Sequence, residues 1–299
     1  MGTVRAGFRS AYGAAPSTKL GCMLTKKKQR AHAAARCVLL AALALTAAAH
    51  AAPAVVDLED MTSPELKARI AAGATTILVP VGGTEQNGPH MVLGKHNVRA
   101  HLLADEIARR LGSAVVAPVI AYVPEGAIKP PQAHMRFTGT ITISDATFES
   151  LLESTARSFK LHGFRDVFFL GDHGSYQKNE QRVADKLNAE WKNDPSCRVH
   201  ALLDYYQATQ TDFVAALRGK GFSQAEIGTH AGLNDTSLSL AVDRNLVRAD
   251  VLAQGKDLDL AHGVYGDPRR SSAELGQIGV QQIVSRSTAA IQRATTAAR

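Results

Sequence analysis

The sequence predicts an α/β fold in which helices cover both faces of a mainly parallel sheet. Short apolar, β-branched runs typical of buried strands alternate with segments whose apolar residues recur at helical spacing. The apolar fraction of 45% and the charged fraction of 20% are those of an ordinary globular protein. No internal repeat or interior linker interrupts residues 55–299, so we expect them to form one domain.

Residues 1–51 have the pattern of a secretory signal. They contain eight Lys and Arg residues and no Asp or Glu, although the whole chain has a net charge of +7. The remaining residues therefore have a net charge of about −1, which gives no reason to expect nucleic acid as a partner. The basic stretch 26–30 precedes the apolar run 37–45, and Ala49-His50-Ala51 is a small-x-small cleavage pattern. Met23 is an alternative start to Met1.

Because that apolar run is too short to span a bilayer, we expect export, to the periplasm or outside the cell, without stable membrane association after cleavage. Cys197 is the one cysteine beyond the signal, so neither an internal disulfide nor a thiolate metal site is expected.

Strand and helix signals alternate along the first two thirds of the domain, as repeated βα units require. Ser63 and Pro64 open the first helix as a capping residue and a first-turn proline, and Gly73 ends it. The expected elements, in order, are a helix at 64–72, a strand at 75–81, a helix at 97–111, strands at 114–123 and 140–143, a helix at 146–161, a strand at 166–170, a helix at 177–191 and a strand at 198–204.

The last third of the chain is predicted to contain two apolar helices. One starts at Leu238 after a polar cluster at 228–237, and the other covers 272–298, where the apolar residues that share one face are Val280, Ile283, Val284 and Ile291. Between the earlier elements, residues 124–139 show no periodicity. A loop of that length inside a compact domain is usually functional or mobile.

Glycine-rich loops after two predicted strands carry histidines and a carboxylate. Ligands of open α/β sheets bind at the carboxyl ends of strands. Catalytic zinc sites use about three N or O protein ligands and leave a position for water, whose pKa falls to near 7. Glu85, His96 and His173 satisfy this count, although any one histidine by itself is more simply explained as a buried or capping residue.

Five motifs in order resemble those of the creatininase family, the creatinine amidohydrolases. They are the stretch 79–82 leading to 85–90, His134 with 137–141, Gly171-Asp172-His173-Gly174, His230-Ala231-Gly232 with 235–237, and 264–268. The resemblance covers most of residues 60–285. It implies a three-layer α/β/α sandwich, metal-dependent hydrolysis of C–N bonds in small cyclic or linear amides, and a homo-oligomer, usually a hexamer.

The departures from the family pattern concern its second metal. Asn87 stands where the family has a histidine, His96 replaces an aspartate that bridges two metals, and Ser175 replaces a glutamate ligand of creatininase. An imidazole cannot bridge two metals as a carboxylate does. We therefore expect one divalent metal ion per chain, held by Glu85, His96 and His173, with zinc preferred and manganese or iron as alternatives.

The catalytic residues that the resemblance implies are His230, Asp235 and His134. His230 matches a catalytic histidine, whereas Asp235 replaces a glutamate that moves protons and is shorter by about 1.5 Å. Proton transfer is therefore also assigned to His230 or His134. Asp235 also has the features of a helix cap, His90 is expected to be structural or to lie behind a ligand, and Asp172 is expected to orient a ligand histidine.

The leading hypothesis is an exported metal-dependent hydrolase that acts on C–N bonds other than peptide bonds, through a metal-activated water. The alternative is an exported metal-binding or ligand-binding protein that has lost turnover, which the missing second-metal ligands favour. A Rossmann-type nucleotide site is not expected, because no G-x-G-x-x-G opens a helix.

Overall fold

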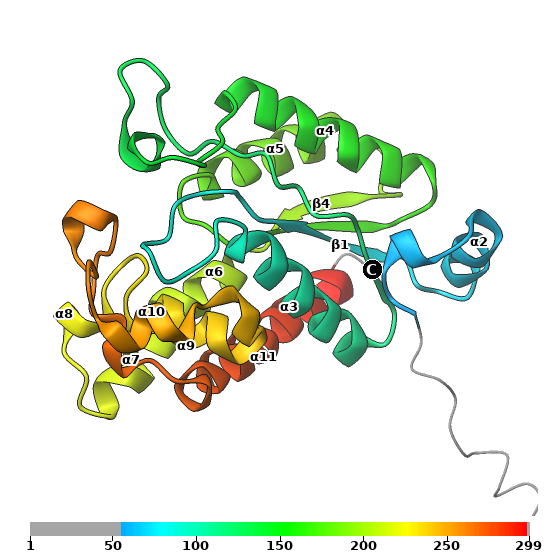
Figure 1. The fold of residues 1–299 in the computed structure, drawn as a ribbon. Coiled ribbons are helices and arrows are strands. Elements are labelled where there is room, and N and C mark those ends of the chain that lie inside the picture. Colours follow the sequence, from blue (N-terminus) through cyan, green and yellow to red (C-terminus); the bar gives the residue numbers. More distant parts are fainter. Residues whose placement is uncertain (1–54, 298–299) are drawn as a thin grey trace, which may run out of the picture. The chain divides into compact units, whose positions relative to one another are not determined.

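The computed structural model describes residues 55–297, which belong to one compact unit that starts at Val55. Four parallel strands form its sheet in the order β2-β1-β3-β4; Figure 1 labels β1 and β4. The strands are β1 (Thr76–Val81), β2 (Ala114–Val116), β3 (Asp166–Gly171) and β4 (Arg198–Ala201). The predicted signal, residues 1–51, lies outside the described residues.

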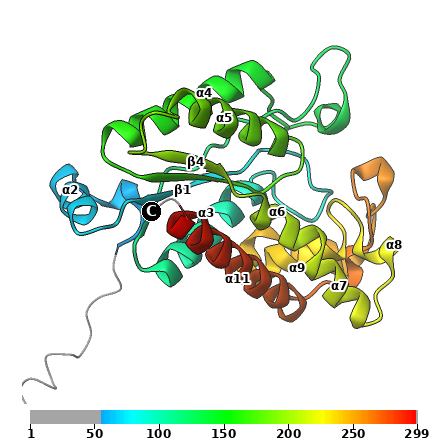
Figure 2. The ribbon, with the colours of Figure 1, turned by 180° about the vertical axis from the view of Figure 1, so that it is seen from behind.

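Successive residues of the strands alternate between two hydrophobic cores. Ile77 and Phe169 pack in one core with α4 (Asp145–Leu161) and α5 (Gln177–Glu190). Leu78 and Phe168 pack in the other core, with α3 (Lys95–Leu111), α6 (Leu203–Gln210), α7 (Asp212–Gly219), α9 (Leu233–Val242) and α11 (Ala273–Ala297). Figures 1 and 2 show α4 and α5 on one side of the sheet and α3 and α11 on the other. The predicted α/β sandwich is thus confirmed.

The helices α9 and α11, which follow the last strand in sequence, pack closely on each other. α9 and α11 approach so closely at Gly276 that a Cβ there would lie 1.8 Å from the carbonyl oxygen of Ser237. The predicted apolar face of α11 is buried through Val280, Ile283 and Val284, as well as Ile291. Among the described residues, none of the helices has the length and apolar character that crossing a membrane requires.

Short helices complete the chain between these elements. The α-helices are α2 (Ser63–Ala71), α8 (Gln224–Ile227) and α10 (Ala249–Gln254). The 3-10 helices are Leu58–Asp60, Ala133–Arg136, Arg244–Leu246, Leu260–His262 and Pro268–Arg270.

Three predicted strands differ from the structure. The strand expected at 114–123 is regular only to Val116, because Pro118 offers no backbone N–H, although Ile120 N still donates to Pro80 O at 3.0 Å. Residues 140–143 join no sheet. The strand expected to reach 204 ends at Ala201, since α6 begins at Leu203.

Two helices begin two or more residues earlier than predicted, and both changes concern the site. α3 begins at Lys95, so His96 lies in its first turn. α9 begins at Leu233, not Leu238, so Asp235 lies within its first turn instead of preceding the helix as a cap.

Candidate metal centre and its pocket

The candidate site lies where the strand order reverses. β1 and β3 are neighbours, yet β2 lies on the far side of β1 and β4 on the far side of β3. Open α/β sheets bind ligands just beyond the strands at such a point. Gly82, directly after β1, comes so close to α3 that a Cβ there would lie 2.2 Å from Oδ1 of Asn97. The loop after β1 is therefore held against the first turn of α3.

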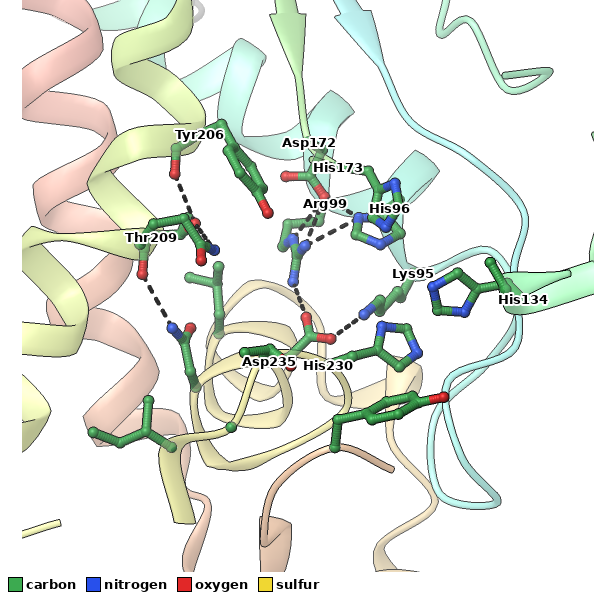
Figure 3. Close-up of a pocket in the computed structure, with 18 residues that line it drawn as sticks. Lys95, His96, Arg99, His134, Asp172, His173, Tyr206, Thr209, His230 and Asp235 are labelled. Carbon is green, nitrogen blue, oxygen red and sulfur yellow. Dashed lines mark hydrogen bonds and ion pairs between the residues drawn. The ribbon is translucent and has the colours of Figure 1, made fainter. Parts of the chain in front are cut away.

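A cavity of about 310 Å³ adjoins this point, a size within the range of small-molecule sites. Figure 3 shows imidazoles from four separate segments directed into the same space. They belong to His96 on α3, His134 on the 3-10 helix at 133–136, His173 after β3, and His230 before α9.

Glu85 is the buried carboxylate around which these imidazoles gather. Its Oε1 lies 2.8 Å from Nε2 of His96 and 3.6 Å from Nδ1 of His230. Its Oε2 lies 3.2 Å from Nε2 of His134 and 3.6 Å from Nε2 of His173, yet makes no hydrogen bond. Although burial opposes ionisation, the hydrogen bond with His96 and the charge of Lys95, whose Nζ lies 3.9 Å from Oε1, hold the pKa of Glu85 well below its ordinary value.

Glu125 adds a second buried carboxylate to the site. Neither of its oxygens has a hydrogen-bond partner, and Oε2 lies 3.6 Å from Nδ1 of His173. Glu85, Glu125, His134 and His173 each offer a ligand atom, and these atoms lie within 4.8 Å of one another. Burial, followed by the charge of Glu85, raises the pKa of Glu125 to about 9. Unpartnered carboxylates beside imidazoles fit a divalent cation such as zinc or manganese.

A chain of hydrogen bonds sets the tautomer of His173. Ser175 Oγ donates to the carbonyl oxygen of Pro124 at 2.8 Å, so toward the imidazole it can only accept. Nδ1 of His173, 2.9 Å away, therefore carries the proton and donates to Ser175; the backbone N–H of Ser175 also lies 3.4 Å from this nitrogen, and the shorter hydroxyl contact decides the assignment. The bare Nε2 faces Glu85, which is the orientation that a metal ligand needs. Burial outweighs the charge of Glu85 and lowers the pKa of His173 to about 4. The ring is therefore neutral near pH 7.

His96 lies between two carboxylates. Its Nδ1 donates to Oδ2 of Asp172 at 2.6 Å, and its Nε2 faces Glu85. Asp172 also accepts from Nε of Arg99 and from the hydroxyl of Tyr205, each at 2.8 Å. Such a carboxylate fixes the ring orientation of a ligand histidine. The structure thus pairs Asp172 with His96, not with the neighbouring His173.

The three predicted metal ligands come together around one carboxylate, since His96 and His173 both direct Nε2 toward Glu85. The assignment of these three as the ligand set stays a prediction, with Glu125 as a further donor. Glu125 follows the apolar run 114–123 almost directly. Glu85 likewise follows a predicted strand. The sequence therefore contains a signal for Glu125 of the same kind.

Asp235 lies on the cavity wall in a network of buried charges. Oδ1 accepts from Nη1 of Arg99 at 2.7 Å, and Oδ2 accepts from Nζ of Lys95 and from the amide of Ala231, the latter at 3.0 Å. Burial opposes ionisation, but Lys95 and Arg99 hold the pKa of Asp235 well below its ordinary value. The proton-transfer role that the family resemblance implies for Asp235 stays a prediction, and the carboxylate is held ionised.

The predicted catalytic histidines His134 and His230 lie side by side, with ring centroids 4.4 Å apart (Figure 3). Both contact Gln86: His230 Nε2 donates to its backbone carbonyl at 2.9 Å, and the side-chain Nε2 of Gln86 lies 3.2 Å from Nδ1 of His134. Burial is the main cause that lowers the pKa of His134, and it lowers that of His230 to about 3. Both rings are therefore neutral near pH 7.

His90 and Asn87 belong to the loop after β1 and do not line the cavity. His90 is buried, with Nε2 2.9 Å from Oγ1 of Thr236. The amide of Asn87 donates to the carbonyl oxygens of Glu85 and Val92 at 2.9 and 3.0 Å. These contacts shape the loop that presents the carboxylate of Glu85.

Comparisons with known proteins agree on one family. A family model described as "Creatininase: Creatinine amidohydrolase" matches residues 59–291. A "Mycofactocin precursor peptide peptidase" of Mycolicibacterium smegmatis is 28% identical over 222 residues, which cover 67% of this chain and 78% of that protein. A "Creatinine amidohydrolase" of Pseudomonas putida is 26% identical over 196 residues, which cover 64% of this chain and 73% of that protein.

A solved structure titled "Creatininase Mn" shares the fold. It aligns with a TM-score of 0.66 and 24% identity, covering 80% of this chain and 98% of that one. Its title names manganese for that protein.

Proposed function

Because this chain belongs to the creatininase family, we propose that it is a metal-dependent hydrolase that cleaves a C–N bond of a small cyclic or linear amide, other than a peptide bond. The observation that supports this most is the buried Glu85 carboxylate, whose Oε2 has no hydrogen-bond partner and faces His134 and His173 at the side of a small cavity. An unpartnered buried carboxylate is costly unless a cation joins it.

One divalent ion per chain is our proposal for the metal, held by Glu85, His96 and His173, with Glu125 within reach. Zinc is preferred, and manganese or iron are alternatives. A cation of this kind lowers the pKa of bound water toward 7 and polarises a carbonyl group.

The chain's own residues position the reactants. Nδ1 of His230 is free to accept a proton, because its Nε2 is committed to the carbonyl of Gln86. Lys95 and Arg99 neutralise Asp235 and Asp172, so the cavity wall carries paired charges. A neutral amide is the substrate class that fits such a wall, because it brings no charge for these pairs to compensate.

Activity of the metal-depleted and reloaded protein on a panel of lactams, formamides and small peptides tests this proposal. We expect hydrolysis of lactams or formamides that a chelator abolishes and zinc or manganese restores. Cleavage of peptides alone would instead favour a peptidase, the activity that the name of the Mycolicibacterium relative states. Metal binding without turnover on any compound would support the alternative of an exported binding protein.

Export and assembly are also proposals. The basic, apolar and small-residue order of residues 1–51 supports removal of a signal, and the family resemblance supports a homo-oligomer, with a hexamer as the expected form. N-terminal sequencing of protein from the native host tests the first, and light scattering after gel filtration tests the second. A mature protein that begins at Met1 or Met23, or a monomer at micromolar concentration, would overturn them.

A further inference from the structure

The side chain of Gln86 is held in one orientation beside two histidines. It is 5% exposed, and its Oε1 accepts a hydrogen bond from the backbone N–H of Gly88 at 3.0 Å. An amide oxygen that accepts there places the amide nitrogen on the opposite side. That nitrogen lies 3.2 Å from Nδ1 of His134 and 3.3 Å from the carbonyl oxygen of Gly263. Its two hydrogens therefore have two acceptors.

This orientation sets the tautomer of His134. Because Gln86 donates to Nδ1, that nitrogen must carry a lone pair, and the single proton of the neutral ring lies on Nε2. Nε2 lies 3.2 Å from Oε2 of Glu85. His134 therefore presents an N–H to the space beside Glu85.

His230 also carries its proton on Nε2. Its bare Nδ1, however, lies toward Glu85, where His134 presents its N–H. A carbonyl oxygen only accepts, so the 2.9 Å contact with the backbone oxygen of Gln86 requires a proton on Nε2 of His230. The side-chain nitrogen of Gln86 also lies 3.2 Å from this Nε2, but two donors cannot bond each other, so the carbonyl contact decides. Nδ1 of His230 is left bare, 3.6 Å from Oε1 of Glu85.

We propose that the side chain of Gln86 is a positioning group that makes His134 a neutral hydrogen-bond donor in the hydrolysis, while the backbone carbonyl of Gln86 leaves Nδ1 of His230 bare for the proton-transfer role that the family resemblance implies. The proposal rests on the hydrolase function proposed above. As water adds to the amide carbon, one of its protons passes to Nδ1 of His230, and the carbonyl oxygen gains negative charge. His134 Nε2–H donates to that oxygen without losing its proton. When the C–N bond breaks, His230 gives its proton to the leaving nitrogen, so both rings return to their starting state.

Gln86→Glu tests the proposal with a change of few atoms. One carboxylate oxygen can still accept from Gly88, but the other accepts where the amide donated, so His134 should move its proton to Nδ1. His230 should not change, because its partner is a backbone carbonyl. The tautomers are read from two-bond ¹H–¹⁵N couplings of histidine-labelled, metal-free protein at alkaline pH, with signals assigned through His134→Gln and His230→Gln.

The expected result is an Nε2–H tautomer for both rings in the parent protein and a switch of His134 alone in Gln86→Glu. On any substrate that is turned over, kcat should fall by about 10²- to 10³-fold, the usual effect of losing one such donor, with little change in KM. Gln86→Leu, which removes the donor without adding a charge, should leave His134 as a mixture of tautomers. Gln254→Glu, an exposed change on α10, is the matched control and should alter neither ring.

An Nδ1–H tautomer of His134 in the parent, or no change in Gln86→Glu and Gln86→Leu, would overturn the inference even if the protein hydrolyses amides. Absence of turnover on every compound would overturn the proposed function, and the couplings would still report whether Gln86 sets the two rings.

Discussion

His96 Nδ1 lies 2.6 Å from Oδ2 of Asp172, and the same oxygen accepts from Nε of Arg99 at 2.8 Å. One buried carboxylate thus orients an imidazole of the site and neutralises a buried guanidinium. The pairing joins the loop after β3 to the first turns of α3, so its loss has two separate consequences that can be measured.

We predict that Asp172→Asn lowers the free energy of unfolding by about 3 to 5 kcal/mol, because Arg99 would keep a buried charge without its main partner. Zinc affinity should also fall by about 10- to 100-fold, since the ring of His96 loses the carboxylate that holds it. Urea denaturation and calorimetric zinc titration measure the two effects. Arg182→Gln, which breaks an exposed pair with Glu149, is the control and should change neither appreciably.

Metal stoichiometry should be one per chain and should depend on Glu85. Glu85→Gln keeps the volume of the side chain but removes the charge on which the imidazoles converge, and we expect it to abolish tight zinc binding in elemental analysis. Asn87→Ala should leave the stoichiometry unchanged, although losing its two bonds to carbonyl oxygens should cost stability. Two metals per chain in the parent protein would contradict the single-metal prediction.

Stability of the metal-free protein should fall as the pH rises above about 7, where the buried histidines no longer add an opposing slope. The pKa of Glu125 is raised from 4.5 to about 9 in the folded state, mainly by burial. A carboxyl group with a raised pKa stabilises the fold below its unfolded pKa, and this contribution is lost progressively up to its folded pKa. The slope from one such group is at most about 1.4 kcal/mol per pH unit. Urea titrations from pH 7 to 9 should show this loss.

Glu125→Gln should reduce that slope by up to about 1.4 kcal/mol per pH unit, because the amide has no proton to lose, and the contribution of Glu180, whose pKa burial also raises, should remain. It should also weaken zinc binding, since the ionised carboxylate is the form that a cation favours. A variant that keeps the parent's alkaline slope would show that another group is responsible.

On the acid side, stability should fall steeply between about pH 6.5 and pH 4. Burial lowers the pKa of His90 and His173 to about 4 and that of His230 to about 3. A histidine with a lowered pKa stabilises the fold above its unfolded pKa of about 6.5, and this contribution is lost as the pH falls toward its folded value. Each ring adds up to about 1.4 kcal/mol per pH unit. His90→Gln should reduce the slope without loss of zinc, because His90 lies outside the cavity wall.

The contact between α9 and α11 predicts a strong effect of a single methyl group. In Gly276→Ala the new Cβ would lie 1.8 Å from the backbone oxygen of Ser237, so one helix must shift, at a cost of about 1 to 3 kcal/mol or more. Gly219→Ala, in α7 with open space around it, should be neutral or stabilising by up to about 1 kcal/mol. Thermal melts of the two variants make the comparison.

Local periodicity was enough to predict most of the strands and helices. The runs at 75–81 and 166–170 are buried strands of the sheet, and the apolar stripe of α11 faces the core as its spacing predicts. Pro118 and Leu203 explain the strands that are shorter than expected: the first removes a ladder donor, and the second begins a helix whose signal overlaps the strand.

The site was predictable only where its residues sit in recognisable motifs. Glu85, His96 and His173 come from glycine-rich loops. Glu125 follows the apolar run 114–123, but its approach to His173, with Oε2 3.6 Å from Nδ1, is a contact between segments far apart in the sequence. The ion pair of Lys95 with Asp235 spans 140 positions in sequence. No local pattern reports which buried charges will meet over such a separation.

Ser175 joins the carbonyl of Pro124 to His173, so the segment at 124–139 is tied to the site at its first residue. That segment supplies both Glu125 and His134. Its displacement would withdraw one oxygen donor and the N–H of His134 at the same moment, so ion exchange and loss of that hydrogen-bond donor become a single kinetic event. Ser175→Ala should therefore raise the rate at which a chelator extracts zinc, because the segment loses its tie to the site and His173 loses the hydroxyl that fixes its tautomer.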